Sequence, residues 1–268
     1  MLTLSGAQLQ ELVVQLLWPL ARILGLIAAS PIFGNRSVPV RLKIGLGILL
    51  TILIAPLVPK GPALDPVGWD GLLITVQQVI IGLGLGFSMR LVFSGVELAG
   101  EIIGLTMGLG FATFFDPQSQ GRSSSISQFL ALIATMSFLA TNGHLTLLAA
   151  LAESFTTLPI SAKALQANGF HTIAAWGGKI FSTGVQLSLP IVTALLITNV
   201  ALAILTRAAP QLNIFGIGFP LTLGIGFILV WLILPYMAVP IDNLFHVGFE
   251  KVRQVARIWA GGPAGSQP

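Results

Sequence analysis

Two glutamates, Glu97 and Glu101, are the pair in this 268-residue chain whose spacing could support chemistry. They are four positions apart, so on a helix they share one face. Charges in an apolar, membrane-like segment are costly unless each has a partner. Three interpretations stay open: a proton or ion relay, salt bridges to another subunit, or a helix end that water reaches. Arg90 precedes Glu97 by seven residues, on the same helix face, and could pair with it.

Enzyme chemistry is not expected from this pair or from the rest of the sequence. Two carboxylates on one helix point the same way, whereas glycosidases and aspartic proteases need opposed groups around a substrate. The phosphate-loop motif G-K-[ST], the zinc motif H-E-x-x-H and the nucleophile motif G-x-S-x-G are absent. The chain has no cysteine, which excludes disulfides and thiol chemistry. We therefore predict no catalytic residues, no cofactor and no metal.

The segment at 108–122, GLGFATFFDPQSQGR, is the most unusual in the chain. Its glycines make the backbone permissive, and its Asp-Pro pair favours a turn. Phe111, Phe114 and Phe115 place bulky apolar side chains on this connection. Two interpretations fit: a re-entrant loop packed on neighbouring helices, or a hydrophobic plug that closes a pore. Both satisfy the rule that irregular backbone at membrane depth must lie inside protein or line a cavity.

Glycines recur at helical spacing on both sides of the glutamates. Gly82 and Gly86 form one G-x-x-x-G pair, and Gly100, Gly104 and Gly108 recur every four residues. Small residues on one ridge let another helix backbone approach closely. The ridge predicts close helix packing, either within the chain or with another subunit.

The composition places these features in a membrane protein. Charged residues make up 8% of the chain and hydrophobic residues 54%, whereas a soluble domain carries about 25% charged residues. The 13 basic residues are scattered, without the stripe that nucleic-acid binding needs. The sequence predicts an all-α, polytopic membrane protein with membrane lipid as a partner and no nucleic acid.

About six long, partly kinked helices are expected, and no β-barrel alternation is present. The apolar runs cover 12–33, 44–58, 72–93, 126–151, 185–205 and 214–241. Residues 94–127 break the pattern, and 152–179 are weakly amphipathic. Basic loop residues divide equally between the two sides that six spans would create, so they favour neither orientation.

Several motifs together resemble one family. They are E-x-x-G-E-x-x-G at 97–104, M-G-L-G-F-A at 107–112, D-P at 116–117, N-G-H at 142–144 and R-A-A-P-Q-L-N-x-F-x-I-G-F-P at 207–220. The last of these is the most specific. The pattern resembles the FliR family of flagellar export-gate proteins, whose sister branch is the SctT proteins of injectisomes. The resemblance covers roughly residues 10–245.

The resemblance implies a domain organisation. Residues 1–179 would form a FliP-like four-helix part that includes a plug loop at 106–122. Residues 180–245 would form a FliQ-like helical hairpin. The composition of residues 246–268 predicts a basic, partly disordered tail that begins as a helix, and the part beyond Val255 carries no resemblance.

The resemblance also implies a function. The chain would be a pore-forming subunit of the flagellar type III protein export gate, in the bacterial inner membrane at the flagellar basal body. It would pass unfolded flagellar subunits, in a hetero-oligomer with FliP, FliQ and FlhB-type subunits. Two alternatives remain: a small secondary transporter that uses Glu97 and Glu101, or the injectisome counterpart of the gate.

The implied site residues fall into three groups. The pore plug would consist of Gly110, Phe111, Ala112, Thr113, Phe114, Phe115, Asp116 and Pro117. Intersubunit or buried polar contacts would involve Arg90, Glu97, Glu101 and Arg207. Close helix packing would use Gly82, Gly86, Gly100, Gly104 and Gly108.

Overall fold

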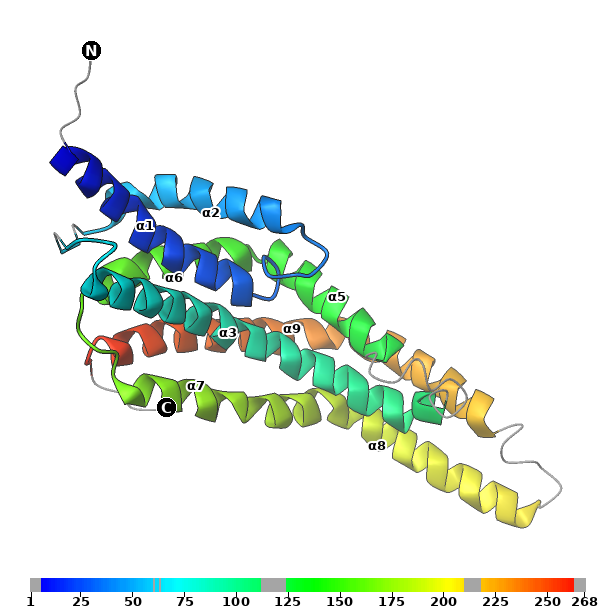
Figure 1. The fold of residues 1–268 in the computed structure, drawn as a ribbon. Coiled ribbons are helices and arrows are strands. Elements are labelled where there is room, and N and C mark those ends of the chain that lie inside the picture. The colour runs from blue at the N-terminus through cyan, green and yellow to red at the C-terminus, as the bar shows by residue number, and fades with distance from the viewer. Residues whose placement is uncertain (1–5, 60, 63, 112–123, 210–217, 263–268) are drawn as a thin grey trace. The chain divides into compact units, whose positions relative to one another are not determined.

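Every regular element in the described part of the chain is a helix, as a computed structural model shows (Figure 1). It describes all residues except 1–5, 60, 63, 112–123, 210–217 and 263–268, and it describes no side chain at 6–14 or at 111. The helices are α1 (Gly6–Ala29), α2 (Val40–Ile54), η1 (Ala55–Leu57), α3 (Trp69–Thr106), η2 (Leu109–Phe111), α5 (Ser125–Ala140), α6 (Gly143–Thr157), α7 (Ala167–Gly177), α8 (Lys179–Ala208) and α9 (Phe219–Trp259). The prediction of an all-α protein is confirmed.

Several of these helices are long and apolar enough to cross a membrane. Among the described residues there are four such segments, or up to five if α5 and α6 together count as one broken span. A polytopic helical membrane protein is thus the fold class, as predicted, although the helix boundaries differ from the six apolar runs.

Two helix boundaries differ from those predicted from the apolar runs. α3 continues through the predicted break to Thr106, because Val96, Ala99 and Ile103 keep one face fully buried. The run at 126–151 is instead divided at Asn142, whose φ of 57° is left-handed. An asparagine tolerates that conformation, but a helix cannot continue through it.

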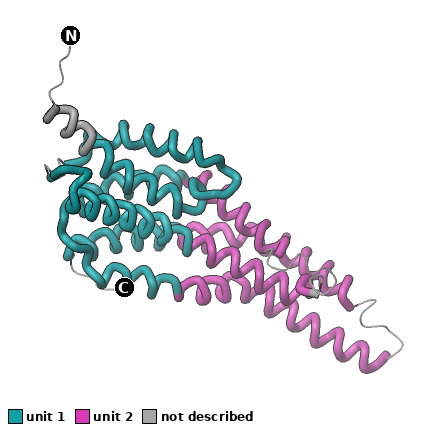
Figure 2. The backbone as a smooth tube through the Cα atoms, viewed as in Figure 1, with its two compact units in different colours: residues 1–91, 142–177, 245–268 teal, residues 92–141, 178–244 magenta. Residues whose placement is uncertain are grey.

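The described chain forms two compact units, shown in different colours in Figure 2. Unit 1 comprises residues 1–91, 142–177 and 245–268, and unit 2 comprises 92–141 and 178–244. The helices α3 and α9 each contribute to both. This division reflects packing within one chain, so the predicted FliP-like and FliQ-like parts stay a prediction.

In unit 1, α1 and α3 pack backbone to backbone. A Cβ at Gly82 would collide with the carbonyl of Arg22, and one at Gly86 would lie 2.6 Å from the carbonyl oxygen of Leu26. From the other helix, a Cβ at Gly25 would lie 2.7 Å from a carbonyl oxygen of α3. Only glycine permits this approach, so the G-x-x-x-G pair at 82–86 contacts a helix of its own chain.

A buried arginine joins three helices of unit 1. Arg22 on α1 is fully buried, and its Nε donates to Gln78 Oε1 on α3 at 2.8 Å. Its two terminal nitrogens donate to the carbonyl oxygens of Ser154 and Leu158 at the end of α6, each at 2.9 Å. The guanidinium carbon also lies 4.2 Å from the ring centroid of Phe155. The positive charge therefore sits where the carbonyls of a helix C-terminus make it favourable.

The C-terminal part of α9 inserts a tryptophan into unit 1. Trp259 is 2% exposed, and its ring lies where a Cβ on Gly84 of α3 or on Gly169 of α7 would collide with it. Phe170 meets the ring edge-on, with centroids 5.3 Å apart. Gly84 projects from the side of α3 opposite Gly82, because two residues turn a helix by about 200°. Gly82 and Gly86 therefore contact α1, whereas Gly84 contacts the Trp259 ring.

We expect replacement of Arg22 to destabilise unit 1. Arg22→Met would remove the arginine donors to the Leu158 carbonyl and to Gln78 Oε1, at roughly 1–3 kcal/mol for each buried group, whereas the Ser154 carbonyl would keep the N–H of Leu158. Thermal unfolding of the purified protein in detergent would measure the loss. Arg253→Met is the matched control, since Arg253 pairs with Glu153 at a partly exposed site. Equal melting temperatures for the two variants would contradict this role of Arg22.

We expect the buried position of the Trp259 ring to depend on the absence of a side chain at Gly84. Gly84→Val would expel the ring and should release the end of α9, which limited proteolysis would detect as faster cleavage near residue 259. Gly45→Val is the control, because a Cβ there meets nothing within 4 Å. Unchanged protection of the Gly84→Val protein would count against the packing role of this ring.

Candidate functional site

The end of α3 and the start of α5 flank the Phe-rich connection in unit 2. α3 ends where the N–H of Met107 donates to Ile103 O at 2.9 Å and that of Gly108 donates to Leu105 O at 3.0 Å. Gly108 has a φ of 91°, a left-handed conformation that ends helices and favours glycine. The sequence therefore stops α3 immediately before the connection.

Ser124 begins α5 and ties it to α3. Its Oγ accepts the N–H of Ser127 at 3.1 Å, which is an N-terminal helix cap. Its own N–H donates to Glu101 Oε1 at 2.8 Å, and its hydroxyl donates to the Gly100 carbonyl at 3.4 Å. The Glu101 carboxylate thus lies at the N-terminus of α5, where the helix dipole favours a negative charge.

Two glycines of the predicted ridge let α5 approach α3. A Cβ on Gly100 would lie 2.7 Å from the backbone nitrogen of Ser127, and one on Gly104 would lie 2.9 Å from Ser124 Oγ. Ser127 Oγ donates to the Glu97 carbonyl at 2.8 Å in the same contact. We call Gly100, Glu101, Gly104, Ser124 and Ser127 the loop-base cluster, because they hold together the two helices that the connection joins.

The third glycine of the ridge packs elsewhere in unit 2. A Cβ on Gly108 would lie 3.2 Å from the ring of Phe219, which begins α9. All three ridge glycines therefore contact segments of their own chain. A role for them in contacts with other subunits stays a prediction.

The predicted polar residues differ in their exposure. Glu97 and Arg90 are exposed on α3, whereas Glu101 is half-buried in the loop-base cluster. Arg207 is exposed in the last turn of α8. Most of the motif that follows, residues 210–217, lies outside the described residues. The predicted intersubunit contacts of these charges stay predictions.

The predicted plug lies mostly outside the described residues. Gly110 and the backbone of Phe111 belong to η2, and a Cβ on Gly110 would lie 3.1 Å from Leu105 Cδ2. The other predicted plug residues, Ala112, Thr113, Phe114, Phe115, Asp116 and Pro117, lie outside. The structure therefore describes where the connection begins and ends.

Sequence reasoning missed the partners of the two buried or half-buried charges. Ser124, a serine directly before an apolar run, carries the usual signal for a helix cap, but its bond to Glu101 depends on how α5 folds onto α3. The Arg22 network carries no local signal, because its acceptors lie more than fifty positions away in the sequence.

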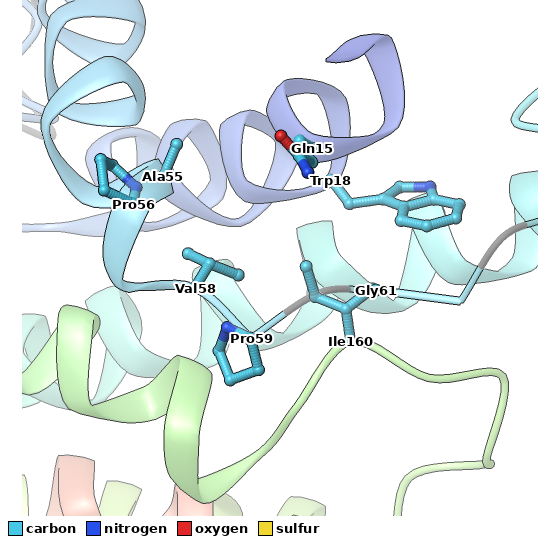
Figure 3. Close-up of a pocket in the computed structure, with 8 residues that line it drawn as sticks. All are labelled: Gln15, Trp18, Ala55, Pro56, Val58, Pro59, Gly61 and Ile160. Carbon is cyan, nitrogen blue, oxygen red and sulfur yellow. The ribbon is translucent and has the colours of Figure 1, made fainter. Parts of the chain in front are cut away.

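One pocket of about 200 Å³ lies in unit 1 (Figure 3). Its lining mixes polar and apolar surface and consists of Gln15, Trp18, Ala55, Pro56, Val58, Pro59, Gly61 and Ile160. None of these side chains titrates, so the pocket offers neither an acid nor a base. Within the described ranges, no three His, Cys, Asp or Glu residues are grouped to hold a metal ion.

Comparison with known proteins agrees with the resemblance. A family model described as "Bacterial export proteins, family 1" matches residues 13–247. The flagellar biosynthetic protein FliR of Pectobacterium carotovorum is 43% identical over 95% of this chain and 97% of its own. The FliR protein of Escherichia coli K12 is 44% identical over 89% of this chain and 91% of its own, and that of Bacillus subtilis is 29% identical over 87% and 91%. The chain belongs to the FliR family of bacterial export proteins.

Proposed function

We propose that this chain is a pore-forming subunit of the flagellar type III protein export gate in the bacterial inner membrane. It would pass unfolded flagellar subunits, and its Phe-rich connection would close the pore. Membership of the FliR family, relatives named for flagellar biosynthesis, and helices of membrane length support this proposal. The chain would catalyse no covalent reaction, and it would act by changing conformation.

The loop-base cluster is the observation that carries the gating part. Glu101 accepts the N–H of Ser124, and Gly104 leaves room for the Ser124 side chain, so the start of α5 lies beside the end of α3. A segment tethered closely at both ends can shift while the helices that hold it stay packed. Such an arrangement suits a plug, because opening would then require no rearrangement of α3 and α5.

The proposed partners are FliP, FliQ and FlhB-type subunits at the flagellar basal body. The most apolar part of the 167–208 segment is only 11% buried within the chain. Surfaces of this kind must face lipid or other membrane helices. A hetero-oligomer would cover much of this apolar area with protein.

The arrangement favours the gate over a small transporter. A carboxylate relay needs two acids that can exchange protons with a pathway, but Glu101 already accepts a backbone N–H at a helix cap. This bond supports an anchoring role. The relatives' names, which refer to the flagellum, favour the flagellar gate over its injectisome counterpart.

Removal of the plug should leave a leaky membrane. Deletion of residues 110–115 in cells that assemble the complex should raise ion permeability, because nothing bulky would then close the pore. Dye uptake and membrane potential report the leak, and the level of assembled complex is the control. Unchanged permeability with normal assembly would refute the plug.

Loss of the carboxylate anchor should have a similar but smaller effect. Glu101→Leu removes the acceptor of the Ser124 N–H, so the tether should loosen and the leak should rise. Glu101→Gln keeps a neutral acceptor and should leak less, and Ser125→Ala, at an exposed neighbouring position, should not leak. Should Glu101→Gln instead abolish proton-driven export while the pore stays tight, the relay interpretation would replace the anchor.

A further inference from the structure

One narrow face of α2 packs within unit 1. Its buried residues are Gly47, Leu50, Thr51 and Ile54, which recur at helical spacing. A Cβ on Gly47 would lie 2.5 Å from Leu24 Cδ2 of α1, so this face meets α1 closely. Most of the remaining surface of α2 is exposed.

The exposed side of α2 is apolar over the thickness of a membrane. Leu42, Leu49 and Leu53 are 64%, 63% and 70% exposed. The apolar segment Val40–Leu57 has 18 residues and is 22% buried, and at 1.5 Å per residue it is about 27 Å long. This length is close to the hydrocarbon thickness of a bilayer. An exposed apolar surface of this length fits the acyl chains of lipids.

Two exposed arginines lie at one end of this apolar side. Arg41 is in the first turn of α2, and Arg36 is in the turn just before it. Among the residues that the structure describes, neither guanidinium has a hydrogen-bond or ion-pair partner. Neighbouring parts of the chain supply no anion, because no Asp or Glu occurs between Glu11 and Asp65. The positive charge of these arginines is therefore not neutralised by the unit that carries them.

A third cation fixes the turn that carries Arg36. Lys43 Nζ donates to the Gly34 carbonyl at 3.0 Å, which bonds the first turn of α2 to the segment before it. Within that turn, the N–H of Ser37 donates to Asn35 Oδ1 at 2.9 Å. An ammonium group has three N–H donors, so Lys43 keeps donors for an anion. Arg36, Arg41 and Lys43 thus place three cations at the same end of α2.

Arg41 lies on the exposed apolar side of α2. Gly45 and Ile52 follow it by four and eleven residues, so all three lie within about 40° of one line along the helix. The buried Leu50, by contrast, lies about 180° around the helix from Arg41. An anionic headgroup bound by Arg41 would therefore have its acyl chains next to the apolar side chains of the same helix.

We propose that this end of α2 binds the headgroup of an anionic phospholipid, whose acyl chains lie along the exposed apolar side of the helix. Guanidinium groups form charge-assisted, often paired hydrogen bonds with phosphate oxygens. Basic residues beside an apolar membrane segment also attract anionic lipids. A zwitterionic lipid carries the same phosphate, but its own cation offsets the charge, so the anionic lipid is preferred. This lipid site does not depend on the proposed export function.

Quenching of a fluorescent label by brominated lipids tests the occupant directly. The chain has no cysteine, and a Cβ at Gly45 meets nothing within 4 Å, so a single cysteine there can carry a bimane label. The labelled full-length chain would be reconstituted, in the complex in which it is purified, into phosphatidylcholine vesicles. We expect brominated phosphatidylglycerol to quench the label at a lower mole fraction than brominated phosphatidylcholine.

Removal of one charge tests the headgroup contact. Arg41→Gln should raise the mole fraction of brominated phosphatidylglycerol that gives half-maximal quenching by about fivefold, the effect expected of one basic residue near an anionic membrane surface. Lys163→Gln removes the same charge from an exposed connection of unit 1 and should leave this mole fraction unchanged. Quenching by brominated phosphatidylcholine shows for each variant whether the label still faces lipid.

Three outcomes would overturn the proposal. Equal quenching by the two brominated lipids would mean that this side of α2 meets lipid without selecting a headgroup. No quenching by either lipid would mean that water or protein covers it, and quenching by aqueous iodide would identify water. An equal shift in the Lys163→Gln protein would mean that only net charge acts. The leak assay of the 110–115 deletion uses other residues and another readout, so the gate and the lipid site can fail separately.

Discussion

The close approach of other segments to the backbone of α3 is the constraint on which the described structure depends. In unit 1, Gly82 and Gly86 admit α1 on one side, and Gly84 admits a tryptophan ring on the other. In unit 2, Gly100 and Gly104 admit the start of α5. A side chain at any of these positions would separate elements that now touch, and close packing of this kind is the principal attraction between helices where lipid removes the hydrophobic drive.

The charges buried in or beside these contacts follow a common rule. Arg22 donates to carbonyls at the C-terminal end of α6, and Glu101 accepts an N–H at the N-terminal cap of α5. Each charge thus meets the helix end whose dipole has the opposite sign. Helix ends carry unsatisfied backbone groups that lipid cannot bond. Arg22 and Glu101 therefore each gain hydrogen-bond partners, and the same bonds satisfy backbone groups at the helix ends.

The same contacts define the place where the proposed gate would work. The loop-base cluster lies at the point where α3 gives way to the Phe-rich connection, and Gly108 makes that break with a left-handed backbone. Rigid packing on one side of this point and a permissive, glycine-rich sequence on the other are what a movable plug requires.

The sequence by itself determined the membrane class, the all-helical fold, the family and the glycine spacing. The membrane class and the helical fold follow from composition and local periodicity, and the family follows from the resemblance of short motifs. Only the tertiary structure decided that α3 runs past Glu97 to Thr106, that Asn142 divides the following helices, and that Trp259 fills a slot over Gly84. It also decided the partners of Arg22 and Glu101. The reason is physical: a hydrogen bond forms only between groups about 3 Å apart, and which distant backbone groups come that close depends on how whole helices pack.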